Sequence, residues 1–274
     1  MILGPSQTDT VRRAVHQNMV SFWGLFPPNE NGPGLKHVDG LTTIDFGIPH
    51  PLLRGVLGSE LAQDSADEII ESATSRFRKI GGPWSWILEP DCTPNDLAAR
   101  LGTHGMASAF QMPGMAIDLD RWARPGSPSN LEILFLKDSA DLETWLKLCF
   151  DVFDIPVEAK TLFRDLHRTL PIAAGEQLGY VLGLLDGKPV ATTNYFLGEG
   201  VAGIYCVATL EEARGKGIAS ALVSACLETG QEYGYRVGIL QSSSKGFNAY
   251  QKLGFEEVCR FNVFVDSTES PSAE

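Results

Sequence analysis

The sequence predicts a mixed α/β fold, in which helices flank a mixed β-sheet and an N-terminal α+β lobe precedes it. Apolar residues recur at helical spacing in some segments and alternate or run continuously in others. In the second half of the chain these two kinds of segment alternate, an order typical of α/β proteins. The 274 residues suffice for one or two domains, and 43% hydrophobic with 20% charged residues is an ordinary globular composition.

The N-terminal lobe is expected over residues 1–120. Ile70, Ala73 and Phe77 share one face of a helix, and Asp39 followed by Gly40 is typical of a tight hairpin turn. The expected elements are helices over 10–26, 65–80 and 93–100, a hairpin over 35–48, and strands over 84–88, 106–111 and 115–119.

The second domain is expected over residues 131–266. Pro, Gly, Ser and Asn cluster in 121–130, which predicts a linker, and the polar, acidic residues 267–274 predict a disordered tail. Asp186 and Gly187 mark a turn between two strands. The expected elements are strands over 131–136, 178–185, 189–197, 201–209, 237–240 and 256–265, and helices over 141–153, 157–170, 215–229 and 246–253.

Charge and cysteine usage exclude several classes of protein. The net charge of −12 argues against binding to nucleic-acid phosphates. Five cysteines without a C-x-x-C pair indicate a reducing compartment, and five histidines without ligand spacing predict no metal site. We find no signal-peptide pattern and no apolar run of about 18 residues, so we expect a cytoplasmic protein without a membrane partner. The oligomeric state stays open.

The most informative segment runs from the strand over 201–209 into the helix that follows it. The loop ends in Arg214, Gly215, Lys216 and Gly217, in an otherwise acidic chain. Glycines at a helix start let backbone N–H groups approach a ligand, and the helix dipole favours an anion there. The segment predicts a phosphate or pyrophosphate cradle, although its spacing fits neither a P-loop nor a dinucleotide fingerprint.

A second segment follows about thirty residues later. It places Tyr250 on a short helix that ends at Gly254. Together the two segments resemble the GNAT superfamily of acyl-CoA-dependent N-acetyltransferases. Arg214, Gly217 and Ala219 match the family's Gln/Arg-x-x-Gly-x-Gly/Ala motif. The downstream match runs from Ser243, where many members carry Asn, through Gly246 and Tyr250 to Phe255, and the resemblance covers residues 130–265.

This resemblance implies a GNAT-like mixed sheet and acetyl-CoA as co-substrate. It implies that a main-chain N–H near Val207 stabilises the oxyanion and that Tyr250 is the general acid that protonates the leaving thiolate. The residues implied to hold acetyl-CoA are Val207, Ala208, Thr209, Arg214, Gly215, Lys216, Gly217, Ile218, Ala219, Ser220 and Ser243.

The implied activity is transfer of an acetyl group to the primary amine of a small molecule, or of a peptide, by direct attack on the thioester. The alternatives are a non-catalytic acyl-CoA-binding sensor, a hydroxyl acceptor or a longer acyl donor. The group that takes the amine proton stays open: Tyr205 and Cys206 are expected on alternate faces of their strand, and Asn194 and Tyr195 lie on the neighbouring strand.

The N-terminal lobe carries a weaker echo of the same pattern. Residues 85–90 form a strand that is followed by a Pro-started helix, but the glycines and the basic pair are missing. The lobe is therefore expected to be either a degenerate GNAT-like half, which would help to wall the acceptor pocket, or an unrelated extension.

Overall fold

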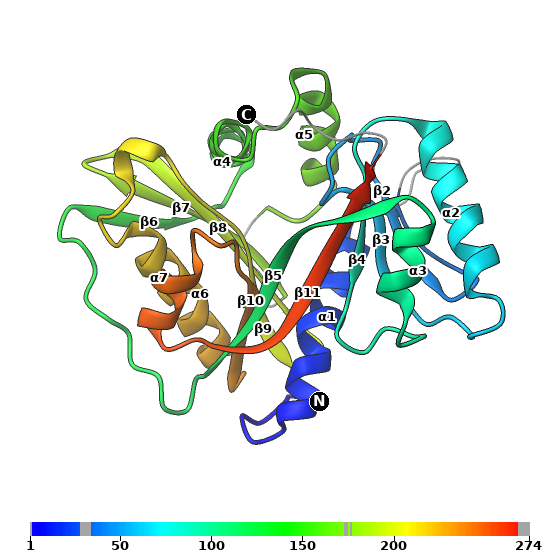
Figure 1. Cartoon of the computed structure of the whole chain (residues 1–274). Helices are drawn as coiled ribbons and strands as arrows, with labels where there is room; N and C mark the ends of the chain where they lie inside the picture. The colour runs from blue at the N-terminus through cyan, green and yellow to red at the C-terminus, as the bar shows by residue number, and fades with distance from the viewer. Residues whose placement is uncertain (1, 28–33, 173–174, 176, 268–274) are drawn as a thin grey trace. The chain divides into compact units, whose positions relative to one another are not determined.

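The computed structural model describes residues 2–27, 34–172, 175 and 177–267, and its elements are shown in Figure 1. The chain forms two compact units. The first unit consists of Met1–Leu25 and Pro113–Cys259, and the second of Phe26–Met112 and Arg260–Glu274. Both β5 (Met106–Asp118) and β11 (Glu256–Asp266) contribute residues to each unit.

The sheet of the first unit has the strand order β5-β10-β9-β8-β7-β6. The neighbours β9 and β10 are parallel, and the other neighbours are antiparallel. The remaining strands of this unit are β6 (Leu131–Phe135), β7 (Leu178–Leu185), β8 (Lys188–Gly198), β9 (Val201–Thr209) and β10 (Val237–Gln241).

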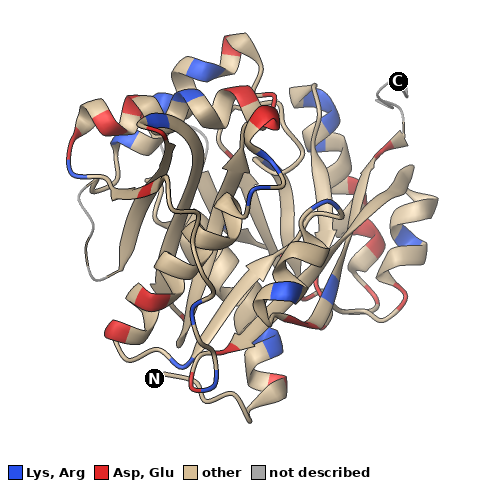
Figure 2. Cartoon of the chain, turned by 90° about the vertical axis from the view of Figure 1, so that its left-hand side faces the viewer, with Lys and Arg blue, Asp and Glu red and all other residues tan. Residues whose placement is uncertain are grey.

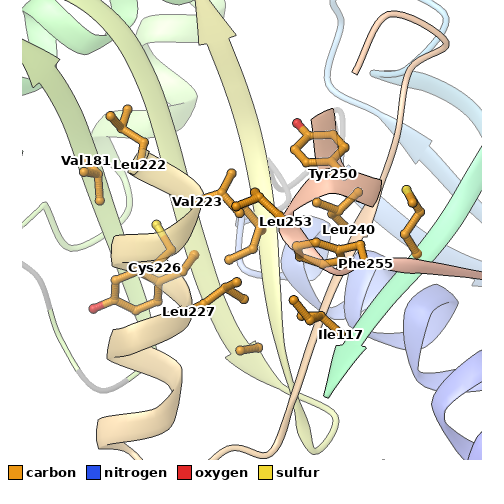
Figure 3. Packing of buried hydrophobic residues seen from close by; sticks show 14 of the residues in the cluster. Ile117, Val181, Leu222, Val223, Cys226, Leu227, Leu240, Tyr250, Leu253 and Phe255 are labelled. Atoms are coloured by element: carbon orange, nitrogen blue, oxygen red, sulfur yellow. The ribbon is translucent and has the colours of Figure 1, made fainter. Parts of the chain in front are cut away.

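Helices cover both faces of this sheet. On one face lie α6 (Ile218–Glu232) and α7 (Phe247–Leu253), whose apolar side chains pack with those of the strands in one core cluster (Figure 3). On the other face α1 (Thr8–Gly24) packs on β8, β9 and β10, and α4 (Ser139–Val152) packs on β7, β8 and β9. A 3₁₀ turn (Val157–Ala159) leads into α5 (Lys160–Arg168), which packs on α4.

Helix α1 approaches β9 closely at Gly203. A Cβ atom at Gly203 would lie only 2.0 Å from Oδ1 of Asn18, so a side chain there would push the helix away. The Asn18 amide donates to the carbonyl of Gly198 over 2.8 Å, and the ring of Phe22 stacks on Tyr205 with centroids 4.3 Å apart. These contacts hold the N-terminal helix on the sheet of the first unit.

The second unit repeats the order of elements found in the first. Its strands are β1 (Gly34–Val38), β2 (Leu41–Asp45), β3 (Arg54–Ser59) and β4 (Ser85–Leu88), with α2 (Ala66–Ile80) after β3 and α3 (Leu97–Thr103) after β4. As in β7 to β10, the first three strands are antiparallel and the last pair is parallel. The hydrophobic core includes the stacked rings of Phe77 and Trp84. The topology is that of a second GNAT-like half, one of the two alternatives predicted for the lobe.

Several predicted boundaries differ from the structure. The strands expected over 106–111 and 115–119 are one continuous strand, because the carbonyl of Pro113 still accepts a bond from the Ser242 N–H at 2.8 Å. Strand β3 was not predicted. Helix α3 begins at Leu97, not at residue 93, and α6 begins at Ile218, not at residue 215, because Gly217 is its left-handed N-cap.

The compact units also divide the chain differently from the predicted ranges 1–120 and 131–266. Antiparallel pairing with β10 brings the second half of β5 into the first unit, and pairing with β4 brings the end of β11 into the second. The expected linker 121–130 lies within the first unit. Of the expected tail, Ser267 bonds to the Gly105 carbonyl, and residues 268–274 lie outside the described part. None of the described helices has both the length and the apolar character needed to cross a membrane.

Candidate functional site

The parallel strands β9 and β10 part at their C-terminal ends. Their paired residues end at Ile204 and Leu240, whereas β9 continues to Thr209. The edge of Val207–Thr209 that faces away from β8 therefore has no strand partner in the described sheet. Unpaired main-chain N–H and C=O groups of this kind are available to a ligand that lies along the strand.

A β-bulge interrupts β9 at the same place. Asn194 pairs with Tyr205 and Thr192 pairs with Ala208, so Cys206 and Val207 together face the single residue Thr193 of β8. Cys206 has a left-handed backbone (φ +50°), a conformation that costs energy in a residue with a side chain. The bulge interrupts the regular ladder at Val207, the residue near which the sequence places the oxyanion-stabilising N–H.

The loop after β9 opens the N-terminus of α6 to solvent. Gly215 and Gly217 have φ values of +76° and +78°, and a Cβ on either would meet no atom within 4 Å. No side chain caps the first turn of α6. The N–H groups of this turn and the positive end of the helix dipole are thus available to an anion.

Two basic residues flank this helix start. Both Arg214 and Lys216 are exposed, and the Arg214 Nε donates to the carbonyl of Thr209 over 3.1 Å. This bond fixes the end of β9 to the loop, a role that the sequence did not suggest. Figure 2 shows the acidic residues spread over several helices and loops. The basic pair thus belongs to a chain whose net charge is −12.

Helix α7 begins at the end of β10, beside the parted strands. The Ser243 hydroxyl accepts a bond from the Gly246 N–H at 3.2 Å, so Ser243 shapes the turn into α7. Tyr250 lies one turn further along, with its ring against Phe255 at a centroid distance of 6.0 Å. In Figure 3 the Tyr250 ring borders the core cluster and its hydroxyl points away from the side chains of Leu253 and Phe255.

Burial raises the pKa of Tyr250 to about 12. Its hydroxyl therefore keeps its proton at neutral pH and can donate it. The ring belongs to the core cluster, as expected for a packed tyrosine, while its polar end borders that cluster, as expected for a general acid. The role of Tyr250 in catalysis stays a prediction.

The face of β9 opposite α6 carries the candidates for the amine side of the reaction. Tyr205 donates to Oδ1 of Asn18 over 2.6 Å. Burial raises the pKa of Cys149 of α4, and the nearby Cys206 thiol adds to this effect. Both side chains thus lie on the α1 and α4 face. The expectation that they alternate is wrong, because the bulge breaks the alternation at Cys206.

The two residues of β8 that are candidates for the amine side, Asn194 and Tyr195, lie on opposite faces of the sheet. Asn194 pairs directly with Tyr205 and shares its face. Tyr195 lies on the α6 face in the core cluster, where its hydroxyl donates to the carbonyl of Gly175 over 2.9 Å. Tyr195 is therefore a structural residue.

The corresponding corner of the second unit is closed by its own chain. Main-chain bonds run from the Leu61 N–H to the Thr93 carbonyl (3.1 Å) and from the Thr93 N–H to the Ser59 carbonyl (3.0 Å), across the ends of β3 and β4. The Ser59 N–H donates to the buried carboxyl group of Glu89 over 2.7 Å. The first turn of α2 holds Asp67 and Glu68, which repel a phosphate. Of the two corners, the one in the first unit leaves main-chain groups of a strand and a helix start open to a ligand.

Residues 140–255 match the family model described as Acetyltransferase (GNAT) family. They form a GNAT acetyltransferase domain. The match contains the parted strands, the glycine loop and α7, which is the region of the first unit that the sequence assigned to acetyl-CoA. The GNAT family generally uses acetyl-CoA.

Solved structures of other proteins share this fold over most of the chain. A GCN5-related N-acetyltransferase from Kribbella flavida has a TM-score of 0.69 at 19% identity and covers 92% of this chain and 95% of its own. A functionally unknown conserved protein from Staphylococcus epidermidis has a TM-score of 0.62 at 11% identity, with coverage of 88% and 95%. A tandem GNAT protein from the clavulanic acid biosynthesis pathway has a TM-score of 0.58 at 15% identity, with coverage of 99% and 98%.

At these identities the likeness shows the fold alone, and the tandem protein matches the two GNAT-like halves seen here. A search of curated protein sequences gives no match. In the part of the chain that the structure describes, no group of three or more His, Cys, Asp or Glu residues could hold a metal ion.

The structure adds three features of the GNAT domain that the sequence did not assign. One is the bulge at Cys206 and Val207, since neither residue type signals a left-handed backbone. Another is the contact of α1 with Tyr205, which joins residues 187 positions apart. The third is the close contact between Gly246 and the Tyr250 ring. No local sequence pattern shows that this position must lack a side chain.

Proposed function

We propose that this protein is an N-acetyltransferase that transfers the acetyl group of acetyl-CoA to the primary amine of a small molecule or peptide. The observation that carries the proposal is the open corner of the GNAT domain, where parted strands, a bulge and an uncapped helix start lie together. The five free cysteines support a reducing, cytoplasmic setting. The activity requires neither a nucleic acid nor a membrane.

The first part of the proposed mechanism is binding of the co-substrate. The N–H groups of Ile218, Ala219 and Ser220 at the α6 start, with Gly215 and Gly217 beside them, would hold the pyrophosphate, and Arg214 and Lys216 supply positive charge. Main-chain groups of Val207, Ala208 and Thr209 would pair with the pantetheine arm, and Ser243 would shape the end of the site. Acetyl-CoA supplies an activated acetyl group as a thioester.

The second part is stabilisation of charge at the reacting carbonyl. The Val207 N–H, which lies at the bulge, would donate to the thioester oxygen as negative charge develops on it. A donor held by a strained backbone does not need to reorganise during the reaction. Tyr250 is protonated at neutral pH, as any tyrosine with a pKa of 10 or above is, and burial raises its pKa further to about 12; it would donate a proton to the departing thiolate.

The amine attacks the thioester directly in this mechanism. Burial raises the pKa of the Cys206 thiol to about 12, and it raises the pKa of Cys149 well above its usual value. Both thiols are therefore protonated and poor nucleophiles, which disfavours an acyl-cysteine intermediate. The candidates for the amine side, Asn194 and Tyr205, lie on the face opposite α6, so the amine would reach the thioester on that face, beside the partly exposed Tyr205.

The proposal is tested by binding and by turnover. Acetyl-CoA at about 100 times its dissociation constant should stabilise the native protein by about 2.7 kcal/mol, measured as a rise in Tm. A panel of primary amines with acetyl-CoA should release free CoA, detected as a thiol, and give an acetylated product of the expected mass. Binding without CoA release for any amine would favour the sensor, and release only with alcohols would favour a hydroxyl acceptor. The absence of binding would exclude both kinds of function.

A charge placed in the cradle gives the sharper test. Ala219→Asp adds a carboxylate to the first turn of α6. The positive end of the helix dipole stabilises this carboxylate, but the carboxylate repels a phosphate. We expect an unchanged Tm without ligand and acetyl-CoA binding weakened about tenfold or more. The matched control is Glu68→Ala in the first turn of α2, which should leave acetyl-CoA binding unchanged because that corner is closed.

A further inference from the structure

Asn194 is a buried polar residue whose side chain bonds to none of the described residues. It is fully buried in β8, yet within this part of the chain neither its amide oxygen nor its amide nitrogen has a hydrogen bond. Buried amide groups in folded proteins are almost always bonded, because leaving one unpaired costs the free energy of removing it from water. Asparagine therefore needs a reason to occupy this position in an otherwise well-packed strand.

The surroundings of Asn194 point to the reacting centre. On the same face, Tyr180 of β7 and Tyr205 of β9 pair directly with it, and the bulge at Cys206 and Val207 begins at the next pair. Tyr180 and Tyr205 already have hydrogen-bond partners, in His167 (3.1 Å) and Asn18 (2.6 Å). Within this row only the amide of Asn194 is without a hydrogen bond.

A ligand could reach this amide from the neighbouring strand. Tyr205 and Cys206, whose side chains lie on the same face as Asn194, are partly exposed, so solvent reaches the residues beside Asn194 although it does not reach Asn194 itself. This is also the face from which the amine approaches in the proposed mechanism, on which the present inference rests.

We propose that Asn194 is a positioning and specificity residue that binds the acceptor molecule. A neutral amine that attacks a carbonyl carbon uses its lone pair for the new bond, so it can donate an N–H to Oδ1 but cannot accept from Nδ2. The amide nitrogen then needs an oxygen elsewhere in the acceptor. The preferred substrates are amines with a neighbouring hydroxyl or carbonyl group, such as amino alcohols or amino-acid amides.

The test compares matched acceptors in the full-length protein. The probes are small primary amines in pairs of equal size, among them 2-aminoethanol with propylamine. For the wild type we expect kcat/KM to be about tenfold or more higher for the member that carries the oxygen, because the plain amine leaves the Asn194 nitrogen unpaired. Asn194→Leu, which is similar in size, should abolish this preference.

Stability separates this role from a structural one. Because Asn194→Leu removes an unpaired polar group, Tm should stay the same or rise, and acetyl-CoA binding should not change. Ser224→Ala is the matched control: its hydroxyl is also buried without a partner, on α6, and its removal should leave the acceptor preference intact. Asn194→Ala replaces the leucine variant if the latter does not fold.

Three results would overturn the inference. The first is a wild type that shows no preference within the pairs, and the second is an Asn194 variant that keeps the preference. The third is a Tm several degrees lower in Asn194→Leu, which would mean that the amide has a structural partner. If the wild type releases no CoA with any amine, the proposed function fails and takes this inference with it.

Discussion

Gly246 lies against the ring of Tyr250. A Cβ atom at Gly246 would be 2.9 Å from the Cε2 atom of Tyr250, closer than packed carbon atoms approach each other. The Gly246 backbone has φ −84°, which any residue can adopt, so the constraint at this position is steric. The pair fixes where the tyrosine hydroxyl lies at the edge of the parted strands.

Gly246→Ala should therefore displace Tyr250 and lower kcat about tenfold or more. Acetyl-CoA binding should change little, because the cradle lies on α6, and overpacking should cost about 1 kcal/mol of stability. Steady-state kinetics with isothermal titration of acetyl-CoA separate these effects. Gly102→Ala is the control, since a Cβ there meets no atom within 4 Å; it should leave kcat unchanged. Unchanged kcat in Gly246→Ala would show that the tyrosine position does not matter.

Removal of the Tyr250 hydroxyl tests the acid role itself. Tyr250→Phe keeps the ring contact with Phe255, so Tm should hold, while kcat should fall about 100-fold. Because burial raises the pKa of Tyr250 to about 12, the wild type should show no loss of activity from this group between pH 7 and 10. A Phe variant with wild-type turnover would assign Tyr250 to the core alone.

Much of the fold of both units follows from local sequence patterns. Asp39 and Gly40 form the predicted hairpin turn with φ values of +50° and +78°, and the stripe of Ile218, Leu222 and Cys226 is buried as expected. These predictions hold because turn conformation and amphipathic periodicity depend on residues close in sequence.

The parts that could not be predicted depend on tertiary contacts. The continuous strand β5 passes through Pro113, which normally ends a strand, because its carbonyl still accepts a bond from Ser242, far along the chain. Strand β3 carries Gly55 and Gly58, which weaken the sequence pattern expected of a strand. Gly55 is required because, at its φ of +143°, a Cβ atom would lie 1.8 Å from the carbonyl oxygen of Ser85. The left-handed Cys206 and the unpaired Asn194 amide are set by strand pairing, which no local pattern encodes.

The glycine N-cap of α6 gives a prediction on backbone conformation. Gly217 has φ +78° and open space around it, so Gly217→Ala introduces strain without a clash. We expect a loss of about 1 kcal/mol in stability, seen in urea unfolding, together with weaker acetyl-CoA binding as the first turn of α6 shifts. Gly126→Ala, in an open loop without a positive φ, should change neither. A stable Gly217→Ala with full affinity would contradict the cradle geometry.

Glu89 gives a prediction on pH in the second unit. Burial raises the pKa of its carboxyl group from 4.5 to about 7, against the opposing effect of the bond from the Ser59 N–H. The native state thus holds this proton more tightly than the unfolded chain. Well below pH 4.5 both states are protonated and Glu89 costs nothing. Between pH 4.5 and about 7 the unfolded chain loses the proton while the native state keeps it, so stability falls as pH rises. Above pH 7, where the native state buries the charge, the cost has reached about 3 kcal/mol.

Glu89→Gln removes this cost and keeps an oxygen for the Ser59 N–H. The difference in free energy of unfolding between variant and wild type should therefore be small at pH 4.5 and should grow in favour of the variant up to about pH 8. Denaturant titrations at several pH values measure it, and Glu68→Gln, at an exposed position that does not contribute to the raised pKa of Glu89, is the control. A difference that does not change with pH would mean that the Glu89 pKa is not raised, and that its carboxylate is stabilised within the closed corner of β3 and β4.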